Sequence, residues 1–386
     1  MTSERDKLLF TPGPLNTSAT VKEAMLSDVG SRDGVFIRIV EEIRERILQI
    51  AGVSKTRGFE AIPMQGSGSF GIEATISAIR PNDRLLVVVN GAYGRRIHQM
   101  AQRWQLDAHA LVSREDEQPD LGQIERLLAS SRGFTHIAAV HCETSSGILN
   151  PIDQIDQIGQ VAKRHGCFFV VDAMSSFGGV PIDITRSHID FLISSSNKCI
   201  QGVPGFSFVV ARRSALLRGA ETQRTVCLDL VEQWNGFESN GQFRFTPPIH
   251  AILAFRQALN ELEEEGGIDG RAARYRKNHE TLVRGVRRLG FHEYVPCQWQ
   301  SWIITTFLYP SDPHFRFQEF YERLADKDLI IYPGKLADVD CFRIGTIGHI
   351  DDQDVEALLA AIPQALEDMK VALPDGRLHA NGEQIK

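Results

Sequence analysis

The 386-residue chain lacks any apolar run that approaches the roughly 20 residues needed to span a bilayer. Its first ten residues, MTSERDKLLF, are charged and lack the apolar core of a signal peptide. No block of basic residues stands out, and the formal net charge is −7. These absences argue against a membrane protein and against nucleic acid as a partner, and we expect a cytoplasmic location.

Paired cysteines are lacking as well. The six cysteines are scattered and form no C-x-x-C pair, which argues against a zinc site or a disulfide framework and fits free thiols. We therefore expect no bound metal. Cys199 directly follows Lys198, but small buried cysteines are more common than nucleophilic ones, so we assign it to packing.

The length and the residue patterns predict two domains. We expect an extended, Pro/Gly-rich segment over residues 1–20, lying across the main body, and a large domain over 21–260. The charged stretch ELEEEGGIDG marks a helix end and a hinge. A smaller α+β domain over 261–375 and a polar, disordered tail over 376–386 complete the chain.

Continuous apolar strands alternate with amphipathic helices through the large domain. Such a pattern is typical of a mainly parallel sheet with both faces covered, so the predicted fold class is α/β. The expected strands are 85–89, 136–141, 167–171, 191–194 and 206–211, and the expected helices are 35–50, 94–104 and 155–165. In the smaller domain we expect strands at 302–307, 329–332 and 341–344 and a closing helix at 352–369.

The stretch FLISSSNKCIQGVPGFSF places Lys198 just after an apolar strand and before a loop of small residues. Ligands of open α/β sheets bind at the carboxyl ends of the strands. A lysine there is partly desolvated, which lowers the pKa of its amine and suits it to attack a carbonyl as a Schiff base. Taken alone, a lysine that ends a strand and points to water is the more common case.

The segment Gly66-Ser67-Gly68-Ser69-Phe70-Gly71 opens a helix and matches G-x-G-x-x-G. A dinucleotide site is one interpretation, but the next strand ends in Asn90 where an acidic residue is expected, and Pro63 interrupts the preceding strand. A phosphate cradle made by the backbone N–H groups of a helix start is another interpretation. A plain structural turn is an equal alternative to the cradle.

Asp172 ends the very apolar strand FFVVD, 26 residues before Lys198. An isolated carboxylate at such a position needs a partner, unless it caps the strand or faces solvent. An amine, a phosphate cradle and a carboxylate are the parts of a pyridoxal-phosphate site, in which the carboxylate keeps the pyridine nitrogen protonated.

The motifs together resemble one family. LLFTPGPL, QGSGSFGIEA, VNGAYGRR, CETSSGILNP, VVDAMSSFGG, SSSNKCIQGVPGF and CFRIGTIG run over nearly the whole chain and are similar to those of the fold-type I, class V aminotransferases. The resemblance implies a pyridoxal 5′-phosphate transferase, with a seven-stranded type of sheet between helices and a smaller C-terminal domain. SNKCIQGVPGFSFV and FRIGTIG resemble the branch that acts on 2-aminoethylphosphonate and pyruvate.

The resemblance assigns roles to individual residues. Lys198 is similar to the Schiff-base lysine that also shuttles the proton, and Asp172 to the partner of the pyridine nitrogen. Tyr93 matches the aromatic that stacks on the ring, although a core tyrosine is the simpler interpretation of that residue alone. The further residues that the resemblance places at the cofactor are Ser67, Gly68, Ser69, Thr144, Asn197 and Thr246. Thr246 matches a threonine that reaches the phosphate from the neighbouring subunit, so the resemblance also implies a homodimer.

Two arginines are candidates for the substrate. Arg343 matches the family's carboxylate-binding arginine, and a planar, permanently charged guanidinium suits a carboxylate or a phosphonate. The segment Ser31–Ile37 departs from the aromatic-rich pattern expected there, and we hypothesise that Arg32 helps to bind the substrate's anionic head. A surface arginine before a helix is an equal alternative.

The resemblance implies transfer of the amine of 2-aminoethylphosphonate to pyruvate, giving phosphonoacetaldehyde and L-alanine. Three alternatives stay open at this point. The first is an alanine–glyoxylate or serine–pyruvate type aminotransferase, or an enzyme acting on a modified aminophosphonate. The second is a dinucleotide-dependent oxidoreductase, and the third is a relative that keeps only the scaffold.

Overall fold

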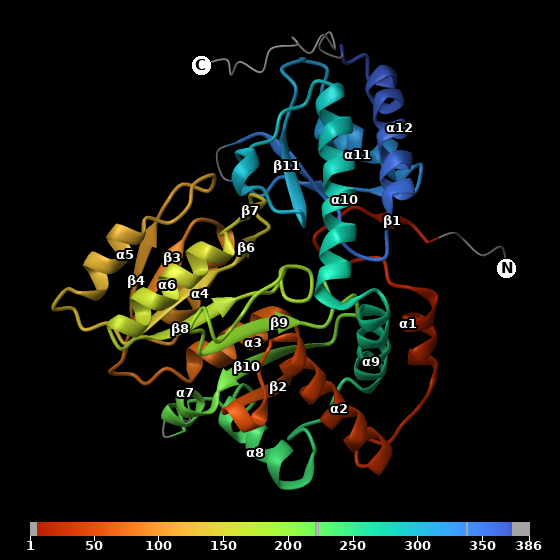
Figure 1. Cartoon of the computed structure of the whole chain (residues 1–386). Helices are drawn as coiled ribbons and strands as arrows, with labels where there is room; N and C mark the ends of the chain where they lie inside the picture. The colour runs from red at the N-terminus through yellow and green to blue at the C-terminus, as the bar shows by residue number, and fades with distance from the viewer. Residues whose placement is uncertain (1–5, 221, 223, 337–338, 373–386) are drawn as a thin grey trace.

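A seven-stranded sheet forms the centre of the larger domain (Figure 1). The strand order is β2-β10-β9-β8-β5-β3-β4, and every strand except β10 runs in the same direction. The strands are β2 (Phe59–Gln65), β3 (Arg84–Val89), β4 (Asp107–Val112), β5 (His136–Val140), β8 (Phe168–Asp172), β9 (Phe191–Ser195) and β10 (Phe206–Arg212).

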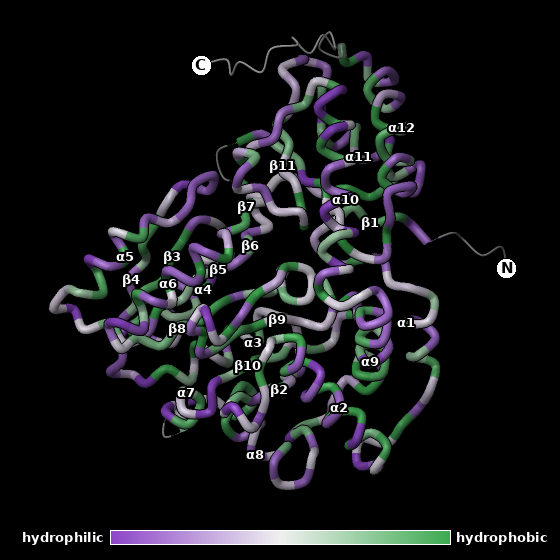
Figure 2. The backbone as a smooth tube through the Cα atoms, viewed as in Figure 1, coloured by the Kyte–Doolittle hydropathy of each residue, from purple (hydrophilic) through white to green (hydrophobic). Residues whose placement is uncertain are grey.

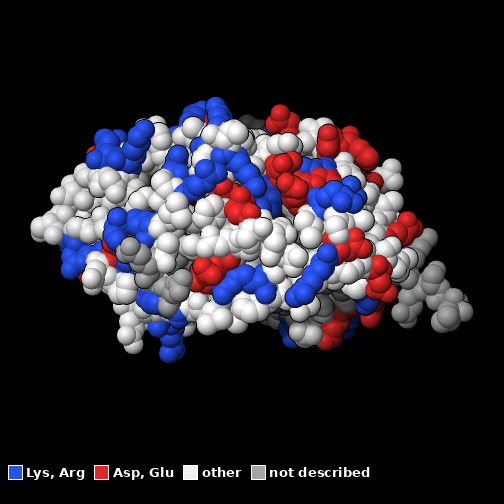
Figure 3. Space-filling view, turned by 90° about the horizontal axis from the view of Figure 1, so that it is seen from below, with Lys and Arg blue, Asp and Glu red and all other residues white. Residues whose placement is uncertain are grey.

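This computed structural model describes residues 6–220, 222, 224–336 and 339–372. The predicted polar tail, 376–386, lies outside the described residues. Among the described residues, no helix combines the length and the apolar character that crossing a membrane requires, and the cytoplasmic location stays a prediction. Acidic and basic side chains intermix on the face seen in Figure 3.

The middle strands are covered on both faces. All five residues of β5 and of β9 are buried, and successive residues of a strand point to opposite sides of the sheet. The hydrophobic tracts of Figure 2 run through these strands. The helices of this domain are α2 (Gly34–Ile50), α3 (Gly68–Ser77), α4 (Ala92–Arg103), α5 (Leu121–Leu128), α6 (Ile152–Arg164), α7 (Arg213–Arg218), α8 (Leu230–Asn240) and α9 (Ile249–Glu264). The predicted α/β sheet between helices is therefore confirmed.

Two edge strands differ from the sequence expectations. β4 was not among the expected strands, because it lies at the sheet edge with a single buried residue, Leu111, and carries little continuous apolar signal. Pro63, which weighed against a central strand, lies in β2 at the opposite edge. An edge strand has no neighbouring strand on its outer side, so a proline whose missing N–H faces outward costs no hydrogen bond between strands.

Over its described residues, the smaller domain consists of a three-stranded antiparallel sheet and three α-helices. The sheet order is β11-β14-β13, with the core aromatics Phe291, Phe307 and Phe342 packed against each other. The elements are α10 (Gly267–Arg288), β11 (Ile304–Leu308), α11 (Phe317–Ala325), β12 (Leu329–Ile330), β13 (Tyr332–Pro333), β14 (Cys341–Gly345) and α12 (Asp352–Asp368). The strand expected at 329–332 is thus two short strands in different sheets.

The N-terminal segment connects the two domains rather than lying across the larger one. β1 (Leu8–Leu9) pairs with β12, and Phe10 is fully buried in the core of the smaller domain. Further on, α1 (Ala19–Glu23) packs against α9. The predicted hinge lies between α9 and α10, where Gly266 has a φ of +93°, a backbone conformation that favours glycine.

Candidate active site

The predicted chemistry gathers around a cavity at the carboxyl ends of the parallel strands. Asp172 ends β8, Lys198 follows β9, and Tyr93 lies in the first turn of α4, which follows β3. All three line a cavity with about 480 Å³ of empty space, together with Ser69, Arg96 and Met174. Parallel strands bring these residues together because their carboxyl ends meet at one edge.

Lys198 is held by the N-terminal segment. Its Nζ donates a hydrogen bond to the carbonyl oxygen of Pro12 at 2.6 Å. The neighbouring Gly13 has a φ of +130°, and a side chain at this position would overlap the Lys198 ammonium. Burial lowers the pKa of Lys198, and the positive charge of Lys335 lowers it further, against the opposing effect of Tyr93 and Asp172. The lysine is therefore biased toward the neutral amine that attacks carbonyls.

Asp172 is a buried carboxylate at the base of the cavity. Its Oδ1 accepts a hydrogen bond from the backbone N–H of Met174 at 2.9 Å. Burial raises the pKa of Asp172 to about 6, although that hydrogen bond and the charges of Arg96 and Lys198 act against the rise. A carboxylate in this setting gains most from a cationic partner, such as a protonated ring nitrogen.

The glycine- and serine-rich loop forms the N-terminus of α3. Ser67 is the N-cap residue, and its side chain makes no capping hydrogen bond. The helix dipole and the first-turn N–H groups favour an anion at this end. Gly68 lies against Met174, so closely that a side chain there would overlap the Met174 sulfur. On the exposed side, Arg96 Nη1 donates to the Ser69 Oγ at 3.3 Å, which adds a positive charge to the cradle.

Tyr93 and Thr144 are in contact above the cavity. Thr144 lies in the turn between β6 (Cys142–Glu143) and β7 (Ile148–Leu149), and its Oγ1 donates to the Tyr93 Oη at 3.3 Å. Burial alone would raise the pKa of Tyr93, but the bond from Thr144 and the charges of Lys335 and Lys198 outweigh it, so its pKa is lowered.

Arg343 reaches the same turn from the smaller domain. It lies in β14, is 5% exposed, and donates from Nε to the Pro333 carbonyl at 3.0 Å and from Nη1 to the Thr144 carbonyl at 2.8 Å. The guanidinium therefore bridges the two domains beside Tyr93. Nη2 of Arg343 donates no hydrogen bond to the described residues, so this nitrogen can serve a planar anion.

Three other predicted residues have more peripheral positions. Asn197 is half-buried beside Lys198, and its Oδ1 accepts from Ser195 Oγ at 3.0 Å. Thr246 is exposed, and its carbonyl accepts from Gln65, the residue before the phosphate loop. Arg32 lies on the surface in the turn before α2, and its side chain makes no hydrogen bond or ion pair with any described residue. The predicted roles of these residues stay predictions.

The structure also places residues at the site that sequence reasoning missed. Pro12 and Gly13 cover Lys198, Arg96 joins the phosphate loop, and Lys335 lies over the Tyr93 ring with its Nζ 4.4 Å from the ring centroid. Glu143 is buried beneath α4 and accepts hydrogen bonds from its first turn. The available signals were the charged residues Arg96 in NGAYGRR, Glu143 in CETSSG and Lys335 in YPGK. The sequence does not show whether these side chains point toward the site.

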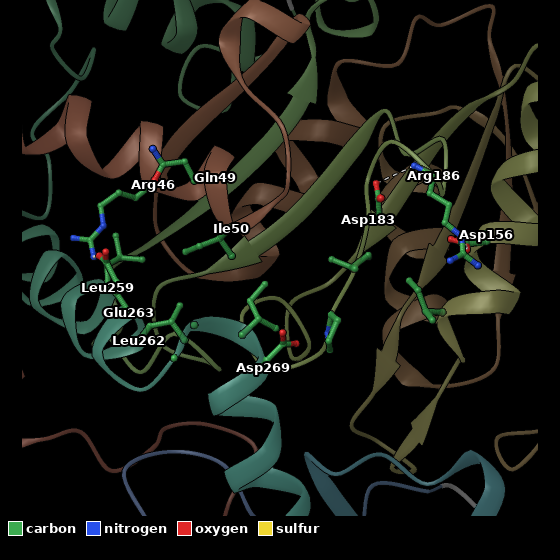
Figure 4. Close-up of a pocket in the computed structure, with 16 residues that line it drawn as sticks. Arg46, Gln49, Ile50, Asp156, Asp183, Arg186, Leu259, Leu262, Glu263 and Asp269 are labelled. Carbon is green, nitrogen blue, oxygen red and sulfur yellow. Dashed lines mark hydrogen bonds and ion pairs between the residues drawn. The ribbon is translucent and has the colours of Figure 1, made fainter.

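A second hollow lies between α2, α6, α9 and the start of α10 (Figure 4). It is open to solvent and holds about 1550 Å³ of empty space. Its arginines are paired within its own wall, Arg46 with Glu263 at 3.2 Å and Arg186 with Asp156 at 2.6 Å. None of the predicted site residues lines it, so the chemistry is assigned to the smaller cavity.

Comparison with known proteins agrees with this geometry. The family model "Aminotransferase class-V" matches residues 17–314. The chain belongs to the class-V aminotransferase family. A 2-aminoethylphosphonate–pyruvate transaminase of Salmonella heidelberg strain SL476 is 49% identical over 373 residues, which cover 96% of this chain and 100% of the relative. The enzyme of the same name from Salmonella typhimurium strain LT2 is 49% identical over 95% of this chain and 99% of its own.

Solved structures share the class-V aminotransferase fold. Alanine–glyoxylate aminotransferase from Nostoc sp. is 26% identical, with a TM-score of 0.85 over 94% of this chain and 96% of that one. Pyridoxamine–pyruvate aminotransferase from Mesorhizobium loti is 22% identical, with a TM-score of 0.86 over 98% and 96%. The second likeness supports the fold alone.

The class-V cofactor, pyridoxal 5′-phosphate, fits the residues present. Lys198, whose pKa is lowered, supplies an amine for the aldehyde. The buried carboxylate of Asp172 suits the ring nitrogen, and the N-terminus of α3, which has no side-chain cap, suits the phosphate. Met174 lines the cavity next to the start of α3, and Gly68 leaves room for it because glycine has no side chain.

Proposed function

We propose that this class-V aminotransferase moves the amino group of 2-aminoethylphosphonate to pyruvate, giving phosphonoacetaldehyde and L-alanine. The observation that carries the proposal is the 49% identity to enzymes of that name over 96% of the chain. The motifs that surround Lys198 and Arg343 lie within the matched region.

Lys198 is the proposed general acid–base. When bound, pyridoxal phosphate supplies an aldehyde that condenses with amines and a ring that takes up electrons. The Nζ of Lys198 would take a proton from the substrate carbon that carries the amine and deliver it to the cofactor carbon that was the aldehyde. Its lowered pKa supports this role, because it favours the neutral amine, which is the form that accepts a proton.

Asp172 and Tyr93 are proposed to set the electrostatics of the ring. Asp172 holds a proton on the ring nitrogen, an interaction that the burial of its carboxylate strengthens. Tyr93 offers an aromatic face on the wall of the same cavity. Ser67, Gly68 and Ser69 are proposed to hold the phosphate at the start of α3, with Arg96 beside them. Thr144 and Asn197 are proposed to complete the cofactor contacts.

Arg343 is the proposed anchor for the anionic end of both substrates. Two carbonyls fix its orientation, and it keeps donors for the carboxylate of pyruvate and the phosphonate of the donor. Holding that end sets the distance from the amine to Lys198, so that reacting atoms meet in one geometry.

We further propose a homodimer in which Thr246 serves the neighbouring subunit's phosphate. Apolar side chains at and near the phosphate loop and in this segment are exposed in the single chain, namely Phe70 at 49%, Phe245 at 44% and Val226 at 68%. A second copy that covers them brings the exposed Thr246 toward a partner site. Arg32, whose side chain makes no hydrogen bond or ion pair with the described residues of its own chain, is proposed to reach the substrate mouth in such a dimer.

The function is tested by mixing the cofactor-loaded protein with 2-aminoethylphosphonate alone and following the cofactor's absorbance. The expected result is conversion of the bound cofactor to its amine form, release of phosphonoacetaldehyde, and restoration by pyruvate with formation of L-alanine. Absence of both changes, with the cofactor visibly bound, would contradict the substrate assignment and leave the family membership intact.

The structural likeness to an alanine–glyoxylate aminotransferase favours one alternative function, an aminotransferase of the alanine–glyoxylate or serine–pyruvate type. L-alanine with glyoxylate, and L-serine with pyruvate, are therefore run in parallel. A higher kcat/KM for either pair than for 2-aminoethylphosphonate with pyruvate would assign the chain to that reaction.

A further inference from the structure

Lys335 brings a second cation to Tyr93, a residue that lines the cavity. It follows β13 in the turn Pro333-Gly334-Lys335, and its Nζ lies 3.4 Å from the Tyr93 Oη and 4.4 Å from the ring centroid. An ammonium over an aromatic face is held by the ring's electron density. The lysine of the smaller domain is thus placed against the residue proposed to face the cofactor.

Arg343 belongs to the same hairpin and meets the same contacts. In the β13–β14 ladder, Arg343 lies opposite Tyr332, and its Nε donates to the Pro333 carbonyl. Its Nη1 reaches Thr144, whose hydroxyl contacts the Tyr93 Oη. One hairpin therefore directs two cations to the Tyr93–Thr144 pair of the larger domain.

The two cations lack acidic partners in the part of the chain that the structure describes. None of the ion pairs within 4.0 Å there involves Arg343 or Lys335. Two clustered and uncompensated cations repel each other, so an anion between them gains from both. Two such cations on one hairpin suit a ligand with more than one negative charge.

The backbone of the turn is firmly held. The Gly334 N–H donates to the Cys341 carbonyl at 2.9 Å, and a side chain at Gly334 would overlap that carbonyl. The stem of Lys335 therefore leaves the hairpin from a fixed point two residues after the Arg343 contact at Pro333. The backbone of Lys335 is therefore held next to β14, the strand that carries Arg343.

We propose that Lys335 is a specificity-determining residue that binds the phosphonate of the donor together with Arg343. This inference rests on the proposed function. A phosphonate has three oxygens and, like a phosphate, carries a charge between −1 and −2 near pH 7, whereas a carboxylate has two oxygens and one charge. The planar fork of Arg343 takes two oxygens, as it does for a carboxylate, and the ammonium of Lys335 takes the third.

The chemistry predicts an unequal contribution of Lys335 to the two substrates. The phosphonate uses both cations, while the carboxylate of pyruvate or alanine is satisfied by Arg343. A role that is only structural, through packing on Tyr93, would affect both substrates alike. Lys335→Met separates these cases, since it keeps the long apolar stem and removes the charge.

The test measures binding of two unreactive anions, ethylphosphonate and propionate, to the cofactor-loaded protein as competitive inhibitors. The variants are Lys335→Met, Lys335→Arg and, as a matched control on the same domain, Lys327→Met, whose lysine contacts Gln364 on the surface. Lys335→Met is expected to weaken ethylphosphonate about tenfold or more, the scale of one lost charge-assisted hydrogen bond, and to change propionate about twofold at most. Lys335→Arg is expected to restore most of the loss, and Lys327→Met to behave as wild type.

Equal weakening of both anions by Lys335→Met, or unchanged binding of both, would overturn the proposal. Kinetics then separate it from the proposed function. Lys335→Met is expected to raise the KM for 2-aminoethylphosphonate and to leave the KM for L-alanine in the reverse direction nearly unchanged. If the wild type does not convert 2-aminoethylphosphonate, the function fails, while the inhibitor ratio still decides whether Lys335 reads a phosphonate.

Discussion

The carboxylate of Glu143 accepts a hydrogen bond from the backbone N–H of Gly94 at 2.7 Å. Its other oxygen accepts from the N–H of Tyr93 at 3.2 Å, so the buried acid anchors the first turn of α4. Burial raises the pKa of Glu143 to about 7, against the lowering effect of these N–H groups. Through this anchor Glu143 sets where the Tyr93 ring stands, and it acts as a positioning residue.

Glu143→Gln is expected to lower the free energy of unfolding by about 1–3 kcal/mol, because the amide turns an N–H group toward backbone N–H donors. The displaced Tyr93 is expected to weaken cofactor affinity severalfold. Urea unfolding of the cofactor-free protein and equilibrium dialysis of the cofactor measure the two effects. Glu125→Gln, at a surface pair with Arg164, is the control. Unchanged cofactor affinity in Glu143→Gln would show that the position of Tyr93 does not depend on its hydrogen bond to Glu143.

Gly13→Ala is expected to reduce activity sharply, because the new side chain meets the Lys198 ammonium and displaces it from Pro12. The positive φ adds strain of about 1 kcal/mol or more. Gly133→Ala is the matched control, since Gly133 also has a positive φ, of +67°, but has open space around it. Comparison of thermal unfolding and kcat for the two variants separates backbone strain from the steric effect on Lys198. Equal activity in both would contradict the contact.

The pH dependence of the cofactor-free protein reports on Asp172. Its folded-state pKa is about 6 and its ordinary value is 3.8, so the folded state holds the proton more tightly than the unfolded state. The stabilising contribution is complete below about pH 3.8 and is lost as the pH rises through 6. Asp172→Asn does not ionise, so its stability relative to wild type is expected to increase from pH 4 to pH 7, by an amount on the order of 3 kcal/mol. Urea unfolding at several pH values measures it, and a flat difference would contradict the raised pKa.

Arg343→Lys is expected to lower kcat/KM about tenfold or more for 2-aminoethylphosphonate and for pyruvate alike. A lysine keeps the charge but cannot hold the Pro333 and Thr144 carbonyls and a bidentate anion together. Steady-state kinetics with each substrate varied gives the result, and thermal unfolding checks that the domains stay packed. A loss confined to the phosphonate would assign the carboxylate to another residue.

Subunit mixing tests the predicted place of Thr246. Lys198→Ala and Thr246→Ala proteins are each expected to have low activity. If Thr246 serves the partner's site, hybrid dimers carry one intact site, and random mixing restores about a quarter of wild-type activity. No recovery, with exchange of subunits confirmed by mass, would place Thr246 in its own subunit's site or outside the site.

The sequence predicts best those features that depend on local pattern. The apolar strands that end at Asp172 and precede Lys198 lie within a residue or two of their expected bounds. β4 escaped prediction because an edge strand needs only one apolar face, and Val112 at its end is 65% exposed. The alternation of strands and helices was sufficient for the fold class.

Features that depend on approach across the fold were not predictable in the same way. Lys335 lies 242 residues after Tyr93, and a lysine in a turn is most often a surface charge. Glu143 next to Thr144 reads as one more polar residue of a hairpin until its burial under α4 is known. The path of residues 8–13, from a strand of the smaller domain to the Lys198 amine, has no signal in composition or periodicity.

That path has a mechanical consequence. Residues 8–9 are strand partners of the smaller domain, whereas residues 19–23 pack on α9 of the larger one. The carbonyl of Pro12 thus belongs to a segment whose two ends pack on different domains. Any rotation of one domain against the other would therefore move the Pro12 carbonyl relative to the Lys198 amine, so the hydrogen bond at the lysine is coupled to the arrangement of the two domains.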